Sequence, residues 1–270
     1  MDKKIFLELL NNLKAKVDKI FLEYNFKKIY SFPQKDCSMT IQPYKNDLLA
    51  TTYKKILDAK GIEEFEKYRQ IILLKCLIYN WDDVFSDKYP LSIQNEYRAS
   101  FKRFLDMCNS EGGWGFYDDD VYWKDLAIAR QQIYPAGAGI VESYSGFGLR
   151  QGLSFNFVQS LKFIKLMFHL NGRRGYYEIH THTPLLNNFN EQGWSDSYIR
   201  IAEMLMKHEE IKGVFRCSWF IDPQLKSISP RLFYLQNTPL SNGAISFYVG
   251  KESHKKCIQI KDKTSFISRG

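Results

Sequence analysis

The sequence predicts an α/β (α+β) fold in which a helical N-terminal region precedes a mixed central sheet flanked by helices. Apolar residues recur at three- and four-residue spacing through the first 110 residues, which is typical of amphipathic helices. A glycine-rich break follows at 111–115. Beyond it, alternating runs of β-branched and aromatic residues come between helical runs. We therefore expect a helical region over 1–110 and an α/β domain over 111–270 that carries the functional site.

Three helices are expected in the N-terminal region. The second, over 62–79, is apolar nearly all round in its second half, so it should lie at the centre of the region. The first spans 2 to about 24, and its stripe consists of Ile5, Leu9, Leu13, Val17, Ile20 and Tyr24. The third spans 91–109, with Ile93, Tyr97, Phe101, Phe104 and Met107 on one side.

The second part of the chain alternates strands with helices. Three consecutive acids, Asp118 to Asp120, favour a solvated turn over a cation site. Strands are expected over 138–144, from Tyr176, over 213–221 and over 244–249. A helix over 155–170 has an apolar stripe, a second begins at a Ser195 N-cap, and a short one lies near 229–235. The stripe of the 155–170 helix consists of Val158, Leu161, Ile164, Lys165 and Phe168.

Composition limits the classes of function. The net charge of +8 and the pI near 9.0 suit an anionic partner, but the lysines are scattered and no Arg/aromatic RNA-binding motif is present, so a nucleic-acid partner is not expected. The five cysteines are odd in number and widely spaced, which argues against a disulfide framework or a zinc ribbon. No apolar run is long enough for a membrane span. We expect a cytoplasmic protein.

The segment from Tyr176 to Thr183 is the strongest candidate for a functional site. Side chains on a strand alternate between two faces, so Glu178, His180 and His182 share one face and Ile179 lies on the other. These three side chains could bind Zn²⁺ or Fe²⁺. A fourth ligand could come from Asp222 or Glu142, if either strand lies beside this one.

Two other interpretations of the same face stay open. Without a metal, the face is a proton-relay surface on which Glu178 or His180 acts as general base. Alternatively, the face is satisfied by hydrogen bonds in a non-catalytic ligand-binding protein. Arg173 and Arg174, in a glycine turn just before the strand, are a further pair that can clamp phosphate or carboxylate.

From Tyr176 onward the expected order is strand, helix, strand, helix, strand. In this order the chain resembles the C-terminal half of the GNAT acyl-CoA N-acyltransferase superfamily, although Gly193 alone represents the family's glycine-rich pyrophosphate loop. The resemblance implies a GNAT-like fold and an acyl group that passes from acyl-CoA or an acyl-carrier protein to a small-molecule amine or hydroxyl acceptor.

The resemblance also implies roles for individual residues. Glu178 or His180, with His182 beside them, would take the proton of the nucleophile, and Tyr234 would protonate the departing thiolate. The cofactor phosphates would lie against Gln192, Gly193, Trp194 and Ser195 at a helix N-terminus. On the following strand, Arg216, Ser218 and Asp222 share a face and are candidates for substrate binding.

Overall fold

The computed structural model describes residues 2–17, 47–110, 119–146, 157–170 and 172–246. The chain forms two compact units, each built from two segments. The first contains residues 1–145 and 175–216, and the second contains 146–174 and 217–270. Helices accompany a four-stranded mixed sheet of order β1-β2-β3-β4. This arrangement confirms the predicted α/β (α+β) fold class.

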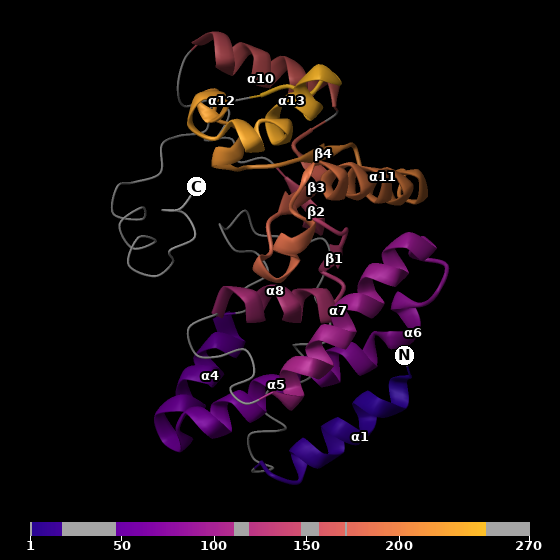
Figure 1. Ribbon diagram of the computed structural model, residues 1–270, viewed down its shortest axis with the longest axis vertical. Coiled ribbons are helices and arrows are strands. Elements are labelled where there is room, and N and C mark those ends of the chain that lie inside the picture. The colour runs from indigo at the N-terminus through magenta and orange to yellow at the C-terminus, as the bar shows by residue number, and fades with distance from the viewer. Residues whose placement is uncertain (1, 18–46, 111–118, 147–156, 171, 247–270) are drawn as a thin grey trace. The chain divides into compact units, whose positions relative to one another are not determined.

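The helical part of the first unit is built around α5 (Ile62–Tyr79). Residues on every side of this helix are buried, among them Tyr68, Ile71 and Leu74, and α5 contacts α1, α4 and α8 (Figure 1). The predicted central helix is therefore confirmed. The other helices of this part are α1 (Lys3–Lys14), α4 (Asp47–Lys60), α6 (Trp81–Val84), α7 (Leu91–Asn109) and α8 (Asp119–Ala129).

The buried face of α1 differs from the predicted stripe. Phe6, Leu10 and Leu13 are buried, whereas Ile5 is largely exposed. The reason is the Phe6 ring, whose centroid lies 5.6 Å from that of Trp81, so the aromatic residue sets the face that α1 turns inward. The helix ends at Lys14, and residues beyond 17 of the predicted helix lie outside the described residues.

Helix α8 begins within the three acids that the sequence predicted to be a solvated turn, and it continues through a segment for which no helix was predicted. Asp119 and Asp120 are its first two residues, and Asp120 pairs with Lys124 one turn later. Asp118 and the glycine-rich break before it lie outside the described residues. Because α8 is buried on nearly all sides, its apolar residues have no helical period that could reveal it.

Four short strands form the sheet. Strand β1 (Ile133–Pro135) pairs antiparallel with β2 (Ile140–Gly146). Strand β3 (Arg174–His180) pairs parallel with β4 (Val214–Phe215), and the 3₁₀ helix η1 (Thr183–Asn188) and α11 (Glu191–Lys207) come between them in the chain. The predicted strand over 213–221 is therefore wrong beyond Phe215. A 3₁₀ turn, η2 (Trp219–Ile221), follows instead, ahead of Asp222-Pro223.

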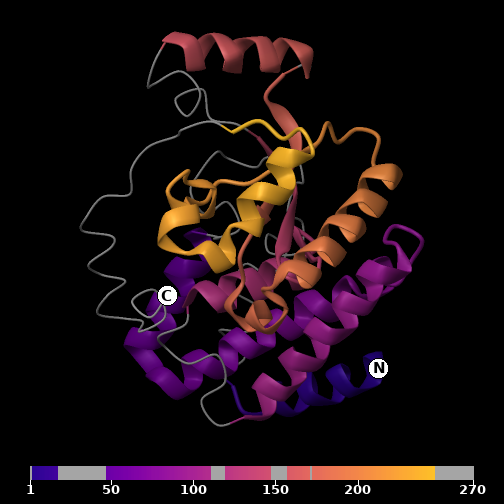
Figure 2. The same ribbon diagram turned by 45° about the horizontal axis from the view of Figure 1, so that its top comes forward.

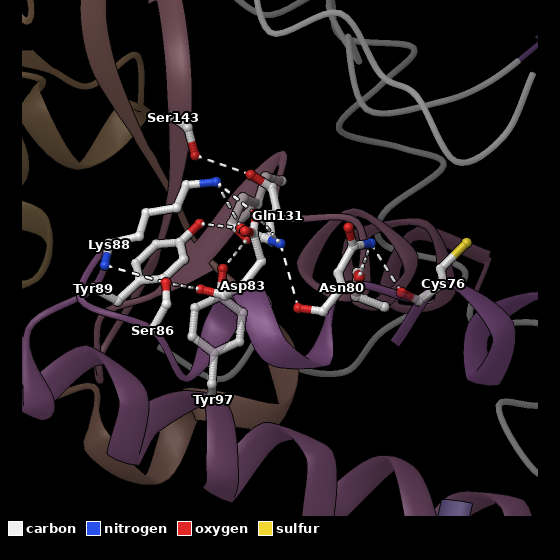
Figure 3. A network of polar contacts seen from close by, with 11 residues as sticks. Cys76, Asn80, Asp83, Ser86, Lys88, Tyr89, Tyr97, Gln131 and Ser143 are labelled. Carbon is white, nitrogen blue, oxygen red and sulfur yellow. Dashed lines mark hydrogen bonds and ion pairs between the residues drawn. The ribbon is translucent and has the colours of Figure 1, made fainter. Parts of the chain in front are cut away.

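Hydrogen bonds of Gln131 connect the β1–β2 hairpin to the helices (Figure 3). Its side-chain oxygen accepts hydrogen bonds from Lys88 Nζ at 2.8 Å and from the Tyr89 hydroxyl at 3.1 Å, and its amide nitrogen donates to Asp83. Its carbonyl accepts from Ser143 Oγ, next to Glu142 on β2. The backbone of Gln131 is left-handed, with φ of 59°, because the chain must turn there directly out of α8. This network fixes the position of β2, and hence of Glu142.

The described helices of the second unit are α10 (Phe157–His169), η2, α12 (Leu225–Ile228), η3 (Pro230–Leu232) and α13 (Tyr234–Ser241). The short helix expected near 229–235 is thus two elements, η3 and α13. Residues 244–246, at the start of the expected last strand, form no strand, and 247–249 lie outside the described residues. None of the helices in the described part of the chain combines the length and the apolar character needed to cross a membrane.

Candidate metal centre

Three side chains of the first unit converge where β2 lies beside β3. Glu142 comes from β2, and Glu178 and His180 come from β3. One ligand atom from each lies within 4.8 Å of the other two. The Glu142 side chain is fully buried, while Glu178 and His180 are half-buried. Glu142 was expected as a further ligand if its strand lay beside β3, and β2 does lie beside β3.

Hydrogen bonds hold this cluster in place. His180 Nε2 lies 3.2 Å from Glu142 Oε2, and Ser145 Oγ donates to Glu178 Oε2 at 2.6 Å. Glu142 pairs with His180, and Ser145, later on β2, pairs with Glu178, earlier on β3. This opposite order along the two strands is the pattern of an antiparallel pair. Each carboxylate is thus held through one oxygen.

The two faces of β3 differ as the alternation predicts. Tyr177 and Ile179 are buried, with 2% and 4% of their surface exposed, and the Tyr177 ring packs edge-on against Tyr134. Glu178 and His180 point to the other face and keep partial exposure. The strand therefore places a packed apolar face behind a polar face that carries the cluster.

Electrostatics at the cluster favour a bound cation. Burial raises the pKa of Glu178, the neighbouring His180 and the hydrogen bond from Ser145 lower it in part, and the Glu142 carboxylate raises it again. Glu142 Oε1 is buried and has no hydrogen-bond partner among the described residues. A cation between the two carboxylates would relieve both their mutual repulsion and the desolvation of Glu142.

His182 has a different environment from His180, although both were placed on one face. Pairing of β3 ends at His180, and His182 is the N-cap residue of η1. Its Nε2 lies 2.8 Å from Asp125 Oδ1, and Arg103 donates to the same carboxylate through both terminal nitrogens. The side chains of His182 and Asp125 are almost completely buried. His182 is therefore held in a buried ion-pair network, outside the three-residue cluster.

The Asp125 carboxylate is ionised in this network. Burial alone would raise its pKa, but the hydrogen bonds and charges of Arg103 and His182 outweigh burial and hold the pKa below its usual value. Since an ionised carboxylate only accepts, His182 Nε2 carries the proton of the contact. His182 Nδ1 is buried and has no hydrogen-bond partner among the described residues.

The residues expected to hold cofactor phosphates lie in the first turn and a half of α11. The N-cap is Asn190, not Ser195 as the sequence predicted, because the Asn190 side chain already accepts the Gly193 N–H at 2.9 Å. A Cβ on Gly193 would lie 2.0 Å from the Asn188 carbonyl oxygen, so glycine is needed there for close packing.

The other three residues of this stretch have different environments. The exposed Gln192 donates to Asp196, Trp194 is buried, and Ser195 is exposed in the second turn. Glu191 adds a negative charge to the first turn, where an anion would have to bind.

The remaining predicted site residues lie apart from the cluster or in the second unit. The Arg216 guanidinium lies over the Trp194 ring, 4.4 Å from its centroid. Ser218 Oγ and Asp222 Oδ1 accept backbone N–H groups of Phe220 and Gln224 two residues further on. The predicted face shared by these residues does not form, because β4 ends at Phe215. Tyr234 begins α13 in the second unit.

Two carboxylates and one imidazole form a set of ligands that suits Zn²⁺, Mn²⁺ or Fe²⁺ and leaves further coordination positions for water or substrate. The sequence pattern found Glu178 and His180 through their alternation. It did not find Ser145, Arg103 or Asp125. Asp125 is the only acid in the mainly apolar segment from Val121 to Ala129, and a lone acid in such a segment is a signal for a buried ion pair.

Comparisons of the chain with protein-family models, with curated protein sequences and with solved structures found no match in any of the three.

Proposed function

We propose that this protein is a metal-dependent enzyme in which Glu142, Glu178 and His180 hold one divalent cation. The observation that carries the proposal is the convergence of three ligand atoms within 4.8 Å on two neighbouring strands. The ligands are anchored on regular structure, which supports a site with defined geometry rather than a chance cluster on a loop.

The buried carboxylate of Glu142 gives the second line of support. An ionised carboxylate that is removed from water costs several kcal/mol unless charges or hydrogen bonds compensate it. Here His180 contacts one oxygen, and the other oxygen has no hydrogen-bond partner among the described residues. A cation supplies the missing partner to Glu142 and at the same time neutralises Glu178 nearby.

Hydrolysis is the reaction class that this ligand set favours. A bound Zn²⁺ lowers the pKa of its water to about 7, so that hydroxide is present at neutral pH. Held by Glu142, Glu178 and His180, zinc would supply this hydroxide for hydrolysis of an acyl or phosphoryl substrate, a reaction that consumes one water and leaves its proton on the leaving group. Ser145 orients Glu178 through its hydrogen bond, which is the kind of contact that fixes a metal-binding carboxylate. The chain's charge of +8 suits an anionic substrate.

The protein purified without a polyhistidine tag should contain about one equivalent of zinc, manganese or iron, because the three ligands are held ready in the folded state. Adding the metal to about 100 times its Kd should raise the free energy of unfolding by about 2.7 kcal/mol. Replacing Glu142 with glutamine should remove both effects. Elemental analysis and thermal melts with and without a chelator measure them.

A matched control is available on the surface. Glu210 lies 3.1 Å from His208 Nδ1, so it is also a glutamate in contact with a histidine, but it is exposed and outside the cluster. Glu210→Gln should retain the metal. Less than about a tenth of an equivalent in the wild type, with melts that a chelator leaves unchanged, would overturn the proposal. Iron as the bound metal would move the reaction class to oxygen activation.

Acyl transfer is a second candidate, supported by a different observation. β3 and β4 pair in parallel and α11 lies between them in the chain, which is the strand–helix–strand order of the GNAT resemblance. The raised pKa of Glu178, which burial causes, would suit it to act as a general base toward an amine or hydroxyl acceptor. An acyl-CoA or acyl-carrier protein would be the donor.

Calorimetric titration with acetyl-CoA and longer acyl-CoA thioesters separates the two candidates. Acyl transfer predicts saturable binding that persists after a chelator has removed all metal. It also predicts that Glu178→Gln abolishes turnover and leaves donor affinity within about threefold, since a general base acts on the acceptor rather than on the donor. Absence of heat with every donor, together with a bound metal, would leave the metal-dependent function alone.

A further inference from the structure

Helix α10 of the second unit carries an apolar stripe that faces outward. The sequence pattern marked this stripe, but it is exposed, and the buried residue of the helix is Phe163 on the other side, with 3% of its surface exposed. Phe157 and Phe168 are 77% and 82% exposed. The other exposed apolar residues of the helix are Val158, Leu161 and Ile164. Both views of the ribbon place α10 at the margin of its own unit (Figures 1 and 2).

The exposed apolar residues form one continuous face. Phe157, Leu161, Ile164 and Phe168 are three or four residues apart, and at 3.6 residues per turn they lie within an arc of about 60°. A soluble helix usually buries such a face against its own domain. In α10 this apolar face is exposed to solvent.

Positive charge borders this face, and α10 itself contains no aspartate or glutamate. Lys162 and Lys165 are exposed on one flank of the stripe. Arg174, which is also exposed, is the first residue of β3, the next element in the chain after the helix. Lysine and arginine side chains bind phosphate groups through charge-assisted hydrogen bonds.

We propose that α10 is a membrane-docking helix that lies in the interface of a bilayer containing anionic lipids. Phe157, Leu161 and Phe168 enter the boundary between headgroups and acyl chains. Lys162, Lys165 and Arg174 contact the lipid phosphates. A positively charged helix with aromatic and leucine residues on its apolar face has the composition of interfacial helices of this kind.

Charge decides between a membrane and a second copy of the chain. A symmetric contact between two copies of α10 would place Lys162 and Lys165 of one copy near the same residues of the other. The helix offers no carboxylate to neutralise them. An anionic bilayer neutralises these charges, and each lysine near such a surface strengthens binding about fivefold.

Flotation of the full chain with lipid vesicles tests the proposal. The wild type should bind vesicles of phosphatidylcholine with about 30 % phosphatidylserine, and binding should weaken as salt is raised. The double variant Lys162→Glu and Lys165→Glu should bind at least about thirtyfold more weakly. Phe157→Ser with Phe168→Ser should lose binding to all vesicles, because the apolar anchors are gone.

Two controls make the result specific to α10. Lys54→Glu with Lys60→Glu makes the same change in net charge on α4, and Ile228→Ser removes an equally exposed apolar residue of α12. Both should bind like the wild type. If the α4 variant binds as weakly as the α10 charge variant, general charge attraction explains the binding and α10 does not dock.

Two further outcomes would overturn the proposal. One is a wild type that binds no vesicles. The other is a wild type that dimerises in sedimentation velocity and loses the dimer, but not vesicle binding, in the Phe157→Ser and Phe168→Ser variant. Circular dichroism establishes that this variant is folded, and Leu161→Gln with Ile164→Gln provides a second variant of the same face that should also lose vesicle binding.

Discussion

Replacing Asp125 with alanine should lower the free energy of unfolding by about 3–5 kcal/mol, because it leaves the buried His182 and the partly buried Arg103 without their shared anion. Arg103 donates two hydrogen bonds to Asp125, and His182 contacts the same carboxylate at 2.8 Å. The carboxylate is completely buried, so water cannot replace it. Urea denaturation at pH 7 measures the loss.

Helix α7, which carries Arg103, provides a control for this variant. Lys102 and Asp106 of α7 also form an ion pair at 2.8 Å, but both side chains are more than half exposed. Solvent screens a pair of this kind, so Asp106→Ala should change the free energy of unfolding by less than about 1 kcal/mol. Equal effects of the two substitutions would contradict the buried network around Asp125.

The effect of Asp125→Ala should also depend on pH. The pKa of Asp125 is lower in the folded protein than in the unfolded chain, because the hydrogen bonds from Arg103 and His182 outweigh burial. A depressed pKa gives stability that is fully present above the unfolded value of about 3.9 and is lost as pH falls through the folded value. The difference between wild type and variant should therefore shrink below about pH 4. A difference that stays constant down to pH 2 would show that the carboxylate is not ionised in the folded state.

Helices with a clear hydrophobic period, or with a length that excludes a strand, could be predicted from the sequence, whereas a short segment that is apolar on all sides could not. The bounds of α7 agree with prediction because one stripe of this helix meets the core. The bounds of α5 also agree, although α5 is buried on every side, because its 18 residues are too many for a strand. Helix α8 was missed because Tyr122 and Ala127, on different sides of it, are both buried. A uniformly apolar segment has no period, and only its tertiary neighbours determine its structure.

The candidate site shows the same limit. Alternation along β3 correctly separates Ile179 from His180, since neighbouring residues on a strand face opposite ways. It cannot show that the strand ends at His180, so His182 was grouped with residues it does not join. Nor can it show which strand lies beside β3, because pairing between distant segments depends on packing of the whole unit. Glu142 and Asp222 were therefore equal alternatives in the sequence.

Helix α10 illustrates a different error. Its period is correct and its bounds are close to prediction, yet the apolar stripe faces solvent. A hydrophobic period establishes that a face is apolar, but not what covers it.

Replacing Ile179 with alanine should lower the free energy of unfolding by about 2–5 kcal/mol, because the side chain is 4% exposed and its removal leaves a cavity. A Cβ on Gly139 would lie 3.4 Å from Ile179 Cγ2 and 3.1 Å from the Trp194 ring, so Gly139, just before β2, and Trp194 of α11 lie close to the space that would open. The matched control is Ile199→Ala on α11, where the isoleucine is 58% exposed and the change should be within about 0.5 kcal/mol.

His180→Ala, one residue further along β3, should affect metal binding more than stability, whereas Ile179→Ala should affect stability and not metal binding. This difference follows if β3 carries a metal on one face and packs against the core on the other. It removes a ligand and the contact with Glu142, so metal binding should be lost while the metal-free protein is destabilised by only about 1–3 kcal/mol. Ile179→Ala should keep the metal, since its side chain lies on the far face. Thermal melts and elemental analysis of both variants distinguish these profiles. If Ile179→Ala is harmless and His180→Ala unfolds the protein, the faces of β3 are reversed and the assignment of Glu178 and His180 to a metal centre fails with them.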